Sequence, residues 1–234
     1  MSAPAPSPRI ENVGEDALLL HFGEHIDAAI NARVHAANNR IQHALPQLET
    51  VPAYASVLLR FDPFAWSGHA GQTPHQAVTQ AVLQALRQTK TALASPRRIE
   101  IPVYYDGEDL SALARHAQLS VEQAIARHTG SNYQVAMLGF APGFAYLLGL
   151  DPALAMPRRA EPRLRVPAGS VAIGGSQTGI YPKPLPGGWQ LIGRTPLRLF
   201  DPAAASPSVL RPGDRVNFRA IDATEFVRLG GDAP

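Results

Sequence analysis

The second half of the sequence carries a group of side chains suited to recognising a ligand. They lie among glycines and prolines, and they are Arg163, Gln177, Tyr181, Trp189, Arg194 and Thr195. Guanidinium groups and the backbone N–H groups of glycine-rich turns bind anionic oxygens, while tyrosine and tryptophan can flank a flat ring and still offer one polar atom. These six residues form the predicted substrate-binding set.

Arg194 is the first candidate within this set. It lies between Gly193 and Thr195, where a loop would present its planar guanidinium to a carboxylate or phosphoryl oxygen. An arginine held in a structural ion pair is the alternative. Trp189 also has two interpretations, because a tryptophan here suits the core of a barrel as well as a stacking platform. Neighbouring arginines offer either an anion clamp or a solvated loop: Arg158, Arg159, Arg163 and Arg165.

No complete catalytic motif accompanies these recognition groups. Residues 174–179 read Gly-Gly-Ser-Gln-Thr-Gly, which fits neither a phosphate-binding P-loop nor a dinucleotide fingerprint. Thr178 stands where a serine nucleophile elbow needs its second glycine, so Ser170 and Ser176 are expected to be structural. All eight histidines lie at or before His128, which leaves the motif-rich half without the commonest general base.

Neither a metal site nor a permanently bound cofactor is expected. His21 and His25 are four residues apart but lie at a predicted strand end, and the sequence has no His-Glu-x-x-His motif and no cysteine. Loop-borne recognition groups without a base or a metal indicate a half-site that another chain completes. The catalytic residues are not assigned.

The composition is that of a globular protein that folds without disulfides, and a cytoplasmic location is expected, although the composition alone leaves secretion open. Of the 234 residues, 45% are hydrophobic and 17% are charged, as in chains that bury a core. The lack of cysteine suits a reducing compartment. No segment is long and apolar enough to span a bilayer, and the net charge of +2 is spread without runs of Lys and Arg. We therefore expect neither a membrane nor a nucleic acid as partner.

The first part of the chain alternates strands with helices. Strands are predicted on both sides of a turn at Gly14 and again over residues 51–62. Helices are predicted from the N-cap Asp27 to Pro46, and from Thr73 with a buried side formed by Val78, Val82, Leu86 and Leu93. The alternation predicts a small α/β sandwich of the split-βαβ type over residues 9–94, after a flexible leader at residues 1–8.

A change of character at Ser95 and Pro96 predicts a domain boundary there. Residues 99–105 read as a strand, and short helices follow at residues 110–118 and 120–128, the second with Ser120 and Gln123 as a capping box. From residue 133 to residue 229, short apolar runs alternate with Pro, Gly and Asp, which is typical of a β-barrel or sandwich. The expected fold class is α+β, with the β-rich domain at residues 95–234.

A series of short motifs runs between residues 139 and 214. They are GFAPGFAY from residue 139, PR from 162, VPAGSV from 166, QTGIYP from 177, PGGW from 186, IGRT from 192 and LFDP from 199. This succession resembles the allophanate-hydrolase-subunit-1 family, which includes the 5-oxoprolinase B subunits and the KipI kinase inhibitor. The resemblance implies that the second domain is a cyclophilin-like β-barrel.

The same resemblance implies a place beside two other subunits of an ATP-dependent 5-oxoprolinase. These partners would be its A subunit and its C subunit, the latter of the allophanate-hydrolase-subunit-2 type. The complex would open 5-oxo-L-proline to L-glutamate, with ATP as a co-substrate that phosphorylates the carbonyl oxygen of the unreactive lactam. The chain would be inactive alone.

Other functions fit the residues as well. A KipI-like inhibitor of a sensor histidine kinase needs no catalytic residues. The acceptor half of a urea carboxylase-type carboxyltransferase is possible only with a biotin carrier on another chain, because this sequence has no Met-Lys-Met attachment site. Proline isomerisation by the barrel has little support from fold alone.

Overall fold

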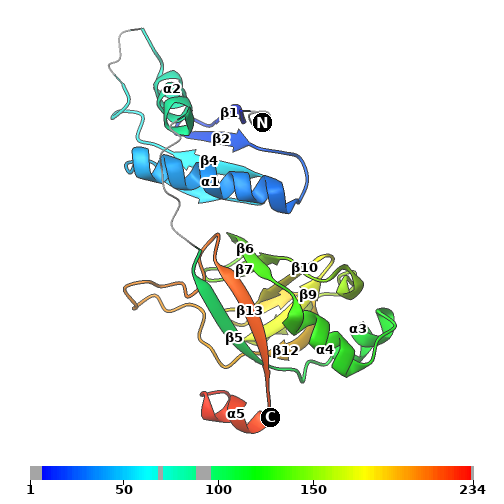
Figure 1. Cartoon of the computed structure of the whole chain (residues 1–234). Coiled ribbons are helices and arrows are strands. Elements are labelled where there is room, and N and C mark those ends of the chain that lie inside the picture. Colours follow the sequence, from blue (N-terminus) through cyan, green and yellow to red (C-terminus); the bar gives the residue numbers. More distant parts are fainter. Residues whose placement is uncertain (1–6, 68–70, 88–95, 233–234) are drawn as a thin grey trace. The chain divides into compact units, whose positions relative to one another are not determined.

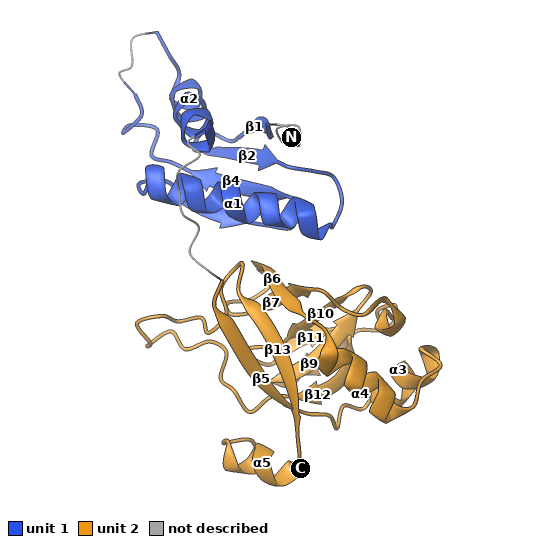
Figure 2. Ribbon diagram, in the orientation of Figure 1, with its two compact units in different colours: residues 1–95 blue, residues 96–234 orange. Residues whose placement is uncertain are grey.

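The computed structural model describes residues 7–67, 71–87 and 96–232. The chain divides into two compact units, unit 1 at residues 1–95 and unit 2 at residues 96–234 (Figure 2). Most of the predicted leader lies outside the described residues, and so does Leu93. The expected α+β class with a closed β-barrel is confirmed.

Unit 1 is a four-stranded antiparallel sheet with two helices packed on it (Figure 1). Its strands are β1 (Arg9–Val13), β2 (Ala17–His21), β3 (Glu49–Pro52) and β4 (Ser56–Arg60), in the order β1-β2-β4-β3. Strand β4 lies between β2 and β3 and is antiparallel to both. The helices α1 (Ala28–Ala44) and α2 (Pro74–Arg87) contact each other and the sheet.

The core of unit 1 contains the apolar faces of its two helices and the buried residues of its central strands. Its fully buried members are Leu18, Leu20, Val34, Ile41, Val57, Leu59, Val78 and Val82. Helix α1 begins as predicted, because the Asp27 carboxylate accepts the N–H groups of Ala29 and Ile30 and satisfies two donors that the first helical turn leaves free.

The single strand expected over residues 51–62 is wrong, since the structure has a hairpin there. Strand β3 ends at Pro52, which cannot donate a ladder hydrogen bond. The Ala53 N–H then donates to the Ser56 carbonyl at 2.8 Å and closes the turn into β4. Apolar residues on both sides of this short turn made the two strands look continuous in the sequence.

Unit 2 is a closed barrel with short helices around it (Figure 1). The barrel order is β10-β7-β6-β13-β5-β12-β9. These strands are β5 (Arg98–Tyr104), β6 (Tyr133–Leu138), β7 (Ala145–Leu148), β9 (Ser170–Gly174), β10 (Gln177–Ile180), β12 (Gln190–Arg194) and β13 (Arg215–Ile221). A separate two-stranded sheet pairs β8 (Arg163–Val166) with β11 (Leu185–Gly187). The parallel pairing of β5 with β13 joins the first and last strands of the unit.

Apolar side chains from most strands fill the barrel. Fully buried members of this core include Ile101, Val103, Tyr133, Val135, Leu147, Ile173, Ile180 and Val216. Helices α3 (Leu110–His116) and α4 (Val121–Gly130) and the 3₁₀ turn η1 (Pro152–Leu154) lie in the connections. The predicted capping box of α4 is confirmed, because Ser120 and Gln123 exchange both hydrogen bonds.

A last helix, α5 (Ala223–Arg228), was not predicted. It is six residues long, which is too short to show a helical repeat. Its start does carry a signal, because the Asp222 carboxylate accepts the Glu225 N–H at 2.7 Å.

Within the part of the chain that the structure describes, no helix combines the length and the apolar character that crossing a membrane requires.

Candidate functional site

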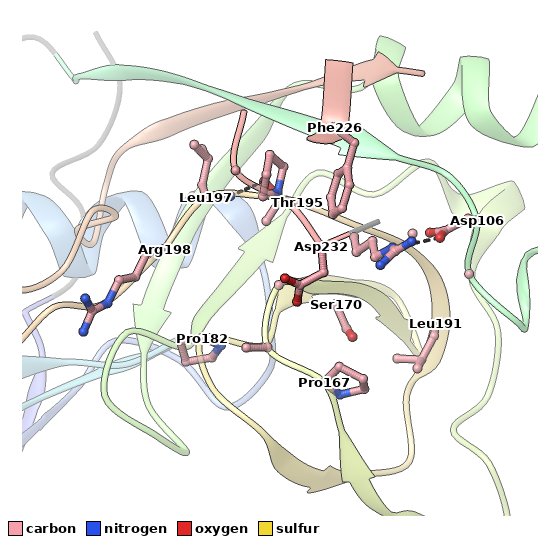
Figure 3. A pocket seen from close by; sticks show the side chains of 18 of the residues that line it. Asp106, Pro167, Ser170, Pro182, Leu191, Thr195, Leu197, Arg198, Phe226 and Asp232 are labelled. Carbon is pink, nitrogen blue, oxygen red and sulfur yellow. Dashed lines mark hydrogen bonds and ion pairs between the residues drawn. The ribbon is translucent and has the colours of Figure 1, made fainter. Parts of the chain in front are cut away.

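The six predicted binding residues do not form one site. Arg194 and Thr195 line a cavity of about 490 Å³ between loops of unit 2, which we call the Arg194 cavity (Figure 3). Tyr181 and Trp189 line a different pocket of about 270 Å³. Arg163 and Gln177 line neither of the two, and Gln177 is buried in β10.

Arg194 is the last residue of β12, and its guanidinium group already has partners within unit 2. Its Nε donates to Asp106 Oδ2 at 2.8 Å. The guanidinium carbon lies 4.7 Å from the centre of the Phe226 ring and 5.8 Å from that of Tyr104, within cation–π range. The structural ion pair, the alternative interpretation from the sequence, is therefore present, and the missed helix α5 supplies one of its walls.

Thr195 also lines the Arg194 cavity. Its side chain is buried, and its Oγ1 accepts the Leu197 N–H at 3.3 Å. Gly169 lies against it with φ of +80°, and a Cβ on Gly169 would come within 2.4 Å of the Thr195 carbonyl oxygen. Only glycine meets both conditions, so the glycine of the VPAGSV motif is explained by packing.

The charges around the Arg194 cavity are largely compensated. Arg194 pairs with Asp106, and Arg198 pairs with Asp201 at 3.5 Å. They are the two arginines among the described lining residues. An anionic ligand in this cavity would have to compete with a carboxylate for each of them.

A lysine at position 194 is expected to lower the free energy of unfolding by about 1–2 kcal/mol, because it loses the planar contact with Phe226 and the Nε bond to Asp106. Arg198→Lys is the matched control, since Arg198 is 70% exposed, and its change should stay within about 0.5 kcal/mol. Denaturant unfolding followed by circular dichroism measures both. A lysine variant of normal stability with greatly reduced turnover would instead assign Arg194 to substrate binding.

Arg163 is tied into the protein through all three nitrogens of its guanidinium. Nη2 lies 2.7 Å from Asp109 Oδ2, Nε lies 2.7 Å from Glu108 Oε1, and Nη1 donates to the Trp189 carbonyl at 3.2 Å. The side chain is 14% exposed. These contacts join β8 to the segment before α3 and to the residue before β12. A substrate-binding role for Arg163 stays a prediction.

The second pocket is lined by aromatic rings and arginines, and we call it the aromatic pocket. Its ring-bearing and charged members are Phe140, Phe144, Tyr146, Arg158, Arg159, Tyr181 and Trp189, with Pro162, Pro186, Gly187 and Gly188 completing the wall. Trp189 and Tyr181 are 5% and 2% exposed and belong to a core cluster outside the barrel interior. Trp189 is therefore a buried core residue, although its cluster is not the barrel interior, and it also borders a pocket. Its role as a stacking platform stays a prediction.

Close packing fixes the position of the Trp189 ring. A Cβ at Gly174 would come within 2.6 Å of the indole, a distance that Cβ atoms do not tolerate, so the ring lies directly on the backbone of β9. Burial raises the pKa of the Tyr181 hydroxyl above its ordinary value. Tyr181 therefore stays neutral and keeps its proton for hydrogen bonding.

Several residues of this region were not in the predicted binding set. Phe140 has a φ of +67° and is 60% exposed, which is a strained conformation for a bulky residue. In the sequence, Arg158 stands out only as part of an arginine cluster, and no motif marks Asp109. The repeated Gly-Phe of the GFAPGF motif was the available signal for Phe140.

No histidine is among the described residues that line these two cavities. His128 is 1% exposed in the barrel core, with Nδ1 2.7 Å from the Tyr105 hydroxyl and Nε2 3.2 Å from Thr178 Oγ1. Burial lowers the pKa of His128 to about 3. Among the same residues, no cluster of three or more His, Cys, Asp or Glu side chains is arranged to hold a metal ion.

Comparison with known proteins places this architecture in a family. Residues 8–210 match the family described as "Carboxyltransferase domain, subdomain C and D". The 5-oxoprolinase B subunit of Bacillus subtilis (strain 168) is 43% identical over 227 residues, which cover 93% of this chain and 95% of that protein.

Solved structures agree with this. The structure of TTHA0988 has a TM-score of 0.76 and 39% identity over 94% of this chain, which corresponds to only 40% of that longer chain. The urea amidolyase of K. lactis, at 19% identity and a TM-score of 0.70 over 97% of this chain, shares the fold and corresponds to 16% of its own chain. The chain therefore belongs to the carboxyltransferase subdomain C and D family, together with the 5-oxoprolinase B subunits.

Proposed function

We propose that this chain is the B subunit of an ATP-dependent 5-oxoprolinase that opens 5-oxo-L-proline to L-glutamate. The observation that carries the proposal is the 43% identity to a 5-oxoprolinase B subunit over nearly the full length of both chains. The A and C subunits of that enzyme are the proposed partners. A cytoplasmic location is part of the proposal, and the absence of cysteine supports it.

The chemistry explains why several chains are needed. A lactam carbonyl is a poor electrophile, and transfer of a phosphoryl group from ATP to its oxygen, with release of ADP, makes the carbon more reactive. Water can then add to this carbon and the C–N bond breaks, with the ring nitrogen leaving as the amine of glutamate. A second water hydrolyses the resulting acyl phosphate to the carboxylate and phosphate. Such a reaction needs a base and groups that hold the phosphates of ATP. The two cavities of unit 2 supply recognition groups, while His128 is buried and neutral. Both facts support an active site that partner subunits complete.

The related longer chain also supports a partner. The region similar to this protein makes up 40% of the TTHA0988 chain, so a homologous unit exists there in covalent linkage with further sequence. For the present protein, we expect a partner chain to supply by association what the rest of the TTHA0988 chain supplies by covalent linkage.

Glutamate release is expected to be negligible with the purified chain, ATP and 5-oxoproline, and to appear when both companion subunits are added. The reason is that no paired base and nucleophile borders either described cavity. An enzymatic glutamate assay on the chain, on the companions and on the mixture tests this. Strong release by the chain alone would contradict the half-site, and none by the mixture would contradict the proposed reaction.

A second candidate is the acceptor half of a urea carboxylase-type carboxyltransferase, which the description of the matching family favours. It requires a biotin carrier on another chain. Affinity purification from the native host separates the possibilities: recovery of a biotinylated protein supports this second function, recovery of the two 5-oxoprolinase subunits supports the first, and recovery of a histidine kinase supports a KipI-like inhibitor instead.

A further inference from the structure

The aromatic pocket differs from the Arg194 cavity in its charge. Its described lining contains two arginines and no carboxylate. Arg159 is partly neutralised, because its Nη1 lies 3.3 Å from Asp109 Oδ1. For Arg158, no carboxylate of the described residues lies within ion-pair distance, and its guanidinium carbon sits 5.6 Å from the centre of a Trp189 ring. Arg158 therefore brings an uncompensated positive charge to an aromatic wall.

Two hydroxyl groups accompany this charge. Tyr146 and Tyr181 both line the pocket. Burial raises the pKa of both, and the nearby charge of Arg158 opposes this rise in both. The two hydroxyls are therefore neutral hydrogen-bonding groups close to one guanidinium, a combination suited to an anionic oxygen atom.

Contacts between aromatic rings hold the walls of the pocket in place. The Tyr146 and Trp189 rings lie 5.9 Å apart and the Phe144 and Trp189 rings 5.8 Å apart, both in edge-to-face arrangements. Phe140 packs edge-on against Phe144 at 5.4 Å. Hydrogen bonds within residues 139–144 hold the turn that keeps Phe140 at a positive φ. Strain of this kind persists where the surroundings enforce it, and it is frequent at ligand-binding sites.

We propose that the aromatic pocket binds a small carboxylate with a flat ring, with Arg158 pairing with the carboxylate and the aromatic side chains enclosing the ring. A volume of about 270 Å³ is just below that of pockets for drug-sized ligands and suits a molecule of this kind. Resting on the proposed function, the ligand is 5-oxoproline, whose lactam is flat and whose carboxylate is free.

Calorimetric titration of 5-oxoproline into the chain assembled with its companion subunits, without ATP, tests the assignment. Arg158→Gln is expected to weaken binding by about tenfold to a hundredfold, the loss typical of a charge-assisted hydrogen bond. Arg165→Gln is the matched control. Arg165 is also exposed and lies seven residues after Arg158 in the sequence, but it does not line the pocket. It should change affinity less than about twofold, the size expected of a surface charge.

A second ligand shows whether Arg158 acts through the carboxylate. 2-Pyrrolidone has the same lactam ring without the carboxylate, so it should bind the wild type at least about tenfold more weakly. Arg158→Gln should not weaken its binding further, because the interaction is already absent. Equal weakening of both ligands by Arg158→Gln, or no difference between the two arginine variants, overturns the assignment.

Glutamate release by the same complexes separates this assignment from the proposed function. If the wild type releases glutamate and Arg158→Gln leaves KM for 5-oxoproline unchanged, the pocket assignment fails and the function stands. If 5-oxoproline binds in an Arg158-dependent way but no glutamate forms with ATP, the pocket assignment stands and the function fails.

Discussion

Replacing Asp109 with alanine is expected to lower the free energy of unfolding by about 3–5 kcal/mol, the cost of breaking a buried ion pair from one side. The Asp109 side chain is 10% exposed. Its Oδ2 accepts the Leu191 N–H and pairs with Arg163, both at 2.7 Å, and its Oδ1 lies 3.3 Å from Arg159. Without this carboxylate, the buried Leu191 N–H loses its acceptor, and Arg163 and Arg159 each lose a carboxylate partner.

Glu108→Ala provides the matched control for Asp109→Ala. Glu108 also pairs with Arg163 at 2.7 Å, but it is 64% exposed, so its loss should change the free energy of unfolding by less than about 1 kcal/mol. Denaturant unfolding of both variants, followed by circular dichroism, measures the difference. Similar small losses for the two substitutions would show that Asp109 does not hold this part of the fold.

The Asp109 contacts also link the stability of unit 2 to the aromatic pocket. Arg159 lines that pocket, and Arg163 binds the Trp189 carbonyl while it pairs with Asp109. The carboxylate therefore anchors both the arginine segment and the chain that carries Trp189. A weaker anchor would loosen the pocket as well as the barrel.

Local signals in the sequence were enough to predict much of the fold. Asp27 and Ser120 are N-caps as expected, because a cap needs only residues within one turn of the chain. The barrel was expected from short apolar runs and from the family resemblance, and it is present. The hairpin at β3 and β4 and the six-residue helix α5 were missed, since a short turn and a short helix leave little periodicity.

The site was harder to predict because its chemistry depends on contacts between distant residues. Arg163 and its partner Asp109 are 54 residues apart, and Arg194 and its partner Asp106 are 88 apart. The sequence shows an arginine in a glycine-rich motif but not the carboxylate that will meet it. For the same reason the sequence could not single out Arg158. Only the structure shows that this arginine has no carboxylate partner among the described residues and lies over Trp189.

His128 is buried in its neutral form, and its hydrogen bonds define the tautomer. Thr178 Oγ1 donates to the Ala172 carbonyl at 2.9 Å, so it must accept a proton from Nε2 of His128 at 3.2 Å. Nδ1 is then the acceptor for the Tyr105 hydroxyl at 2.7 Å. A proton added at Nδ1 would place a charge in the barrel core and remove the acceptor for Tyr105.

This burial makes the stability of the fold sensitive to mild acid. The pKa of His128 falls from 6.5 to about 3 because of desolvation, so below pH 6.5 the unfolded chain binds a proton that the folded chain does not. This proton uptake lowers the free energy of unfolding progressively as the pH falls from 6.5 toward 3, and it has no effect above pH 6.5. The slope of this decrease approaches about 1.4 kcal/mol per pH unit.

The variant His128→Gln is expected to be less stable than the wild type at pH 7 and to lose less stability between pH 6.5 and pH 4.5. Glutamine is neutral throughout, so one proton disappears from the difference between the folded and unfolded states. Carboxyl groups whose pKa is lowered in the fold, such as Asp151 and Glu225, act mainly below this window and equally in both proteins. Denaturant unfolding at several pH values measures the two slopes, and parallel slopes would mean that His128 is not held neutral in the folded barrel.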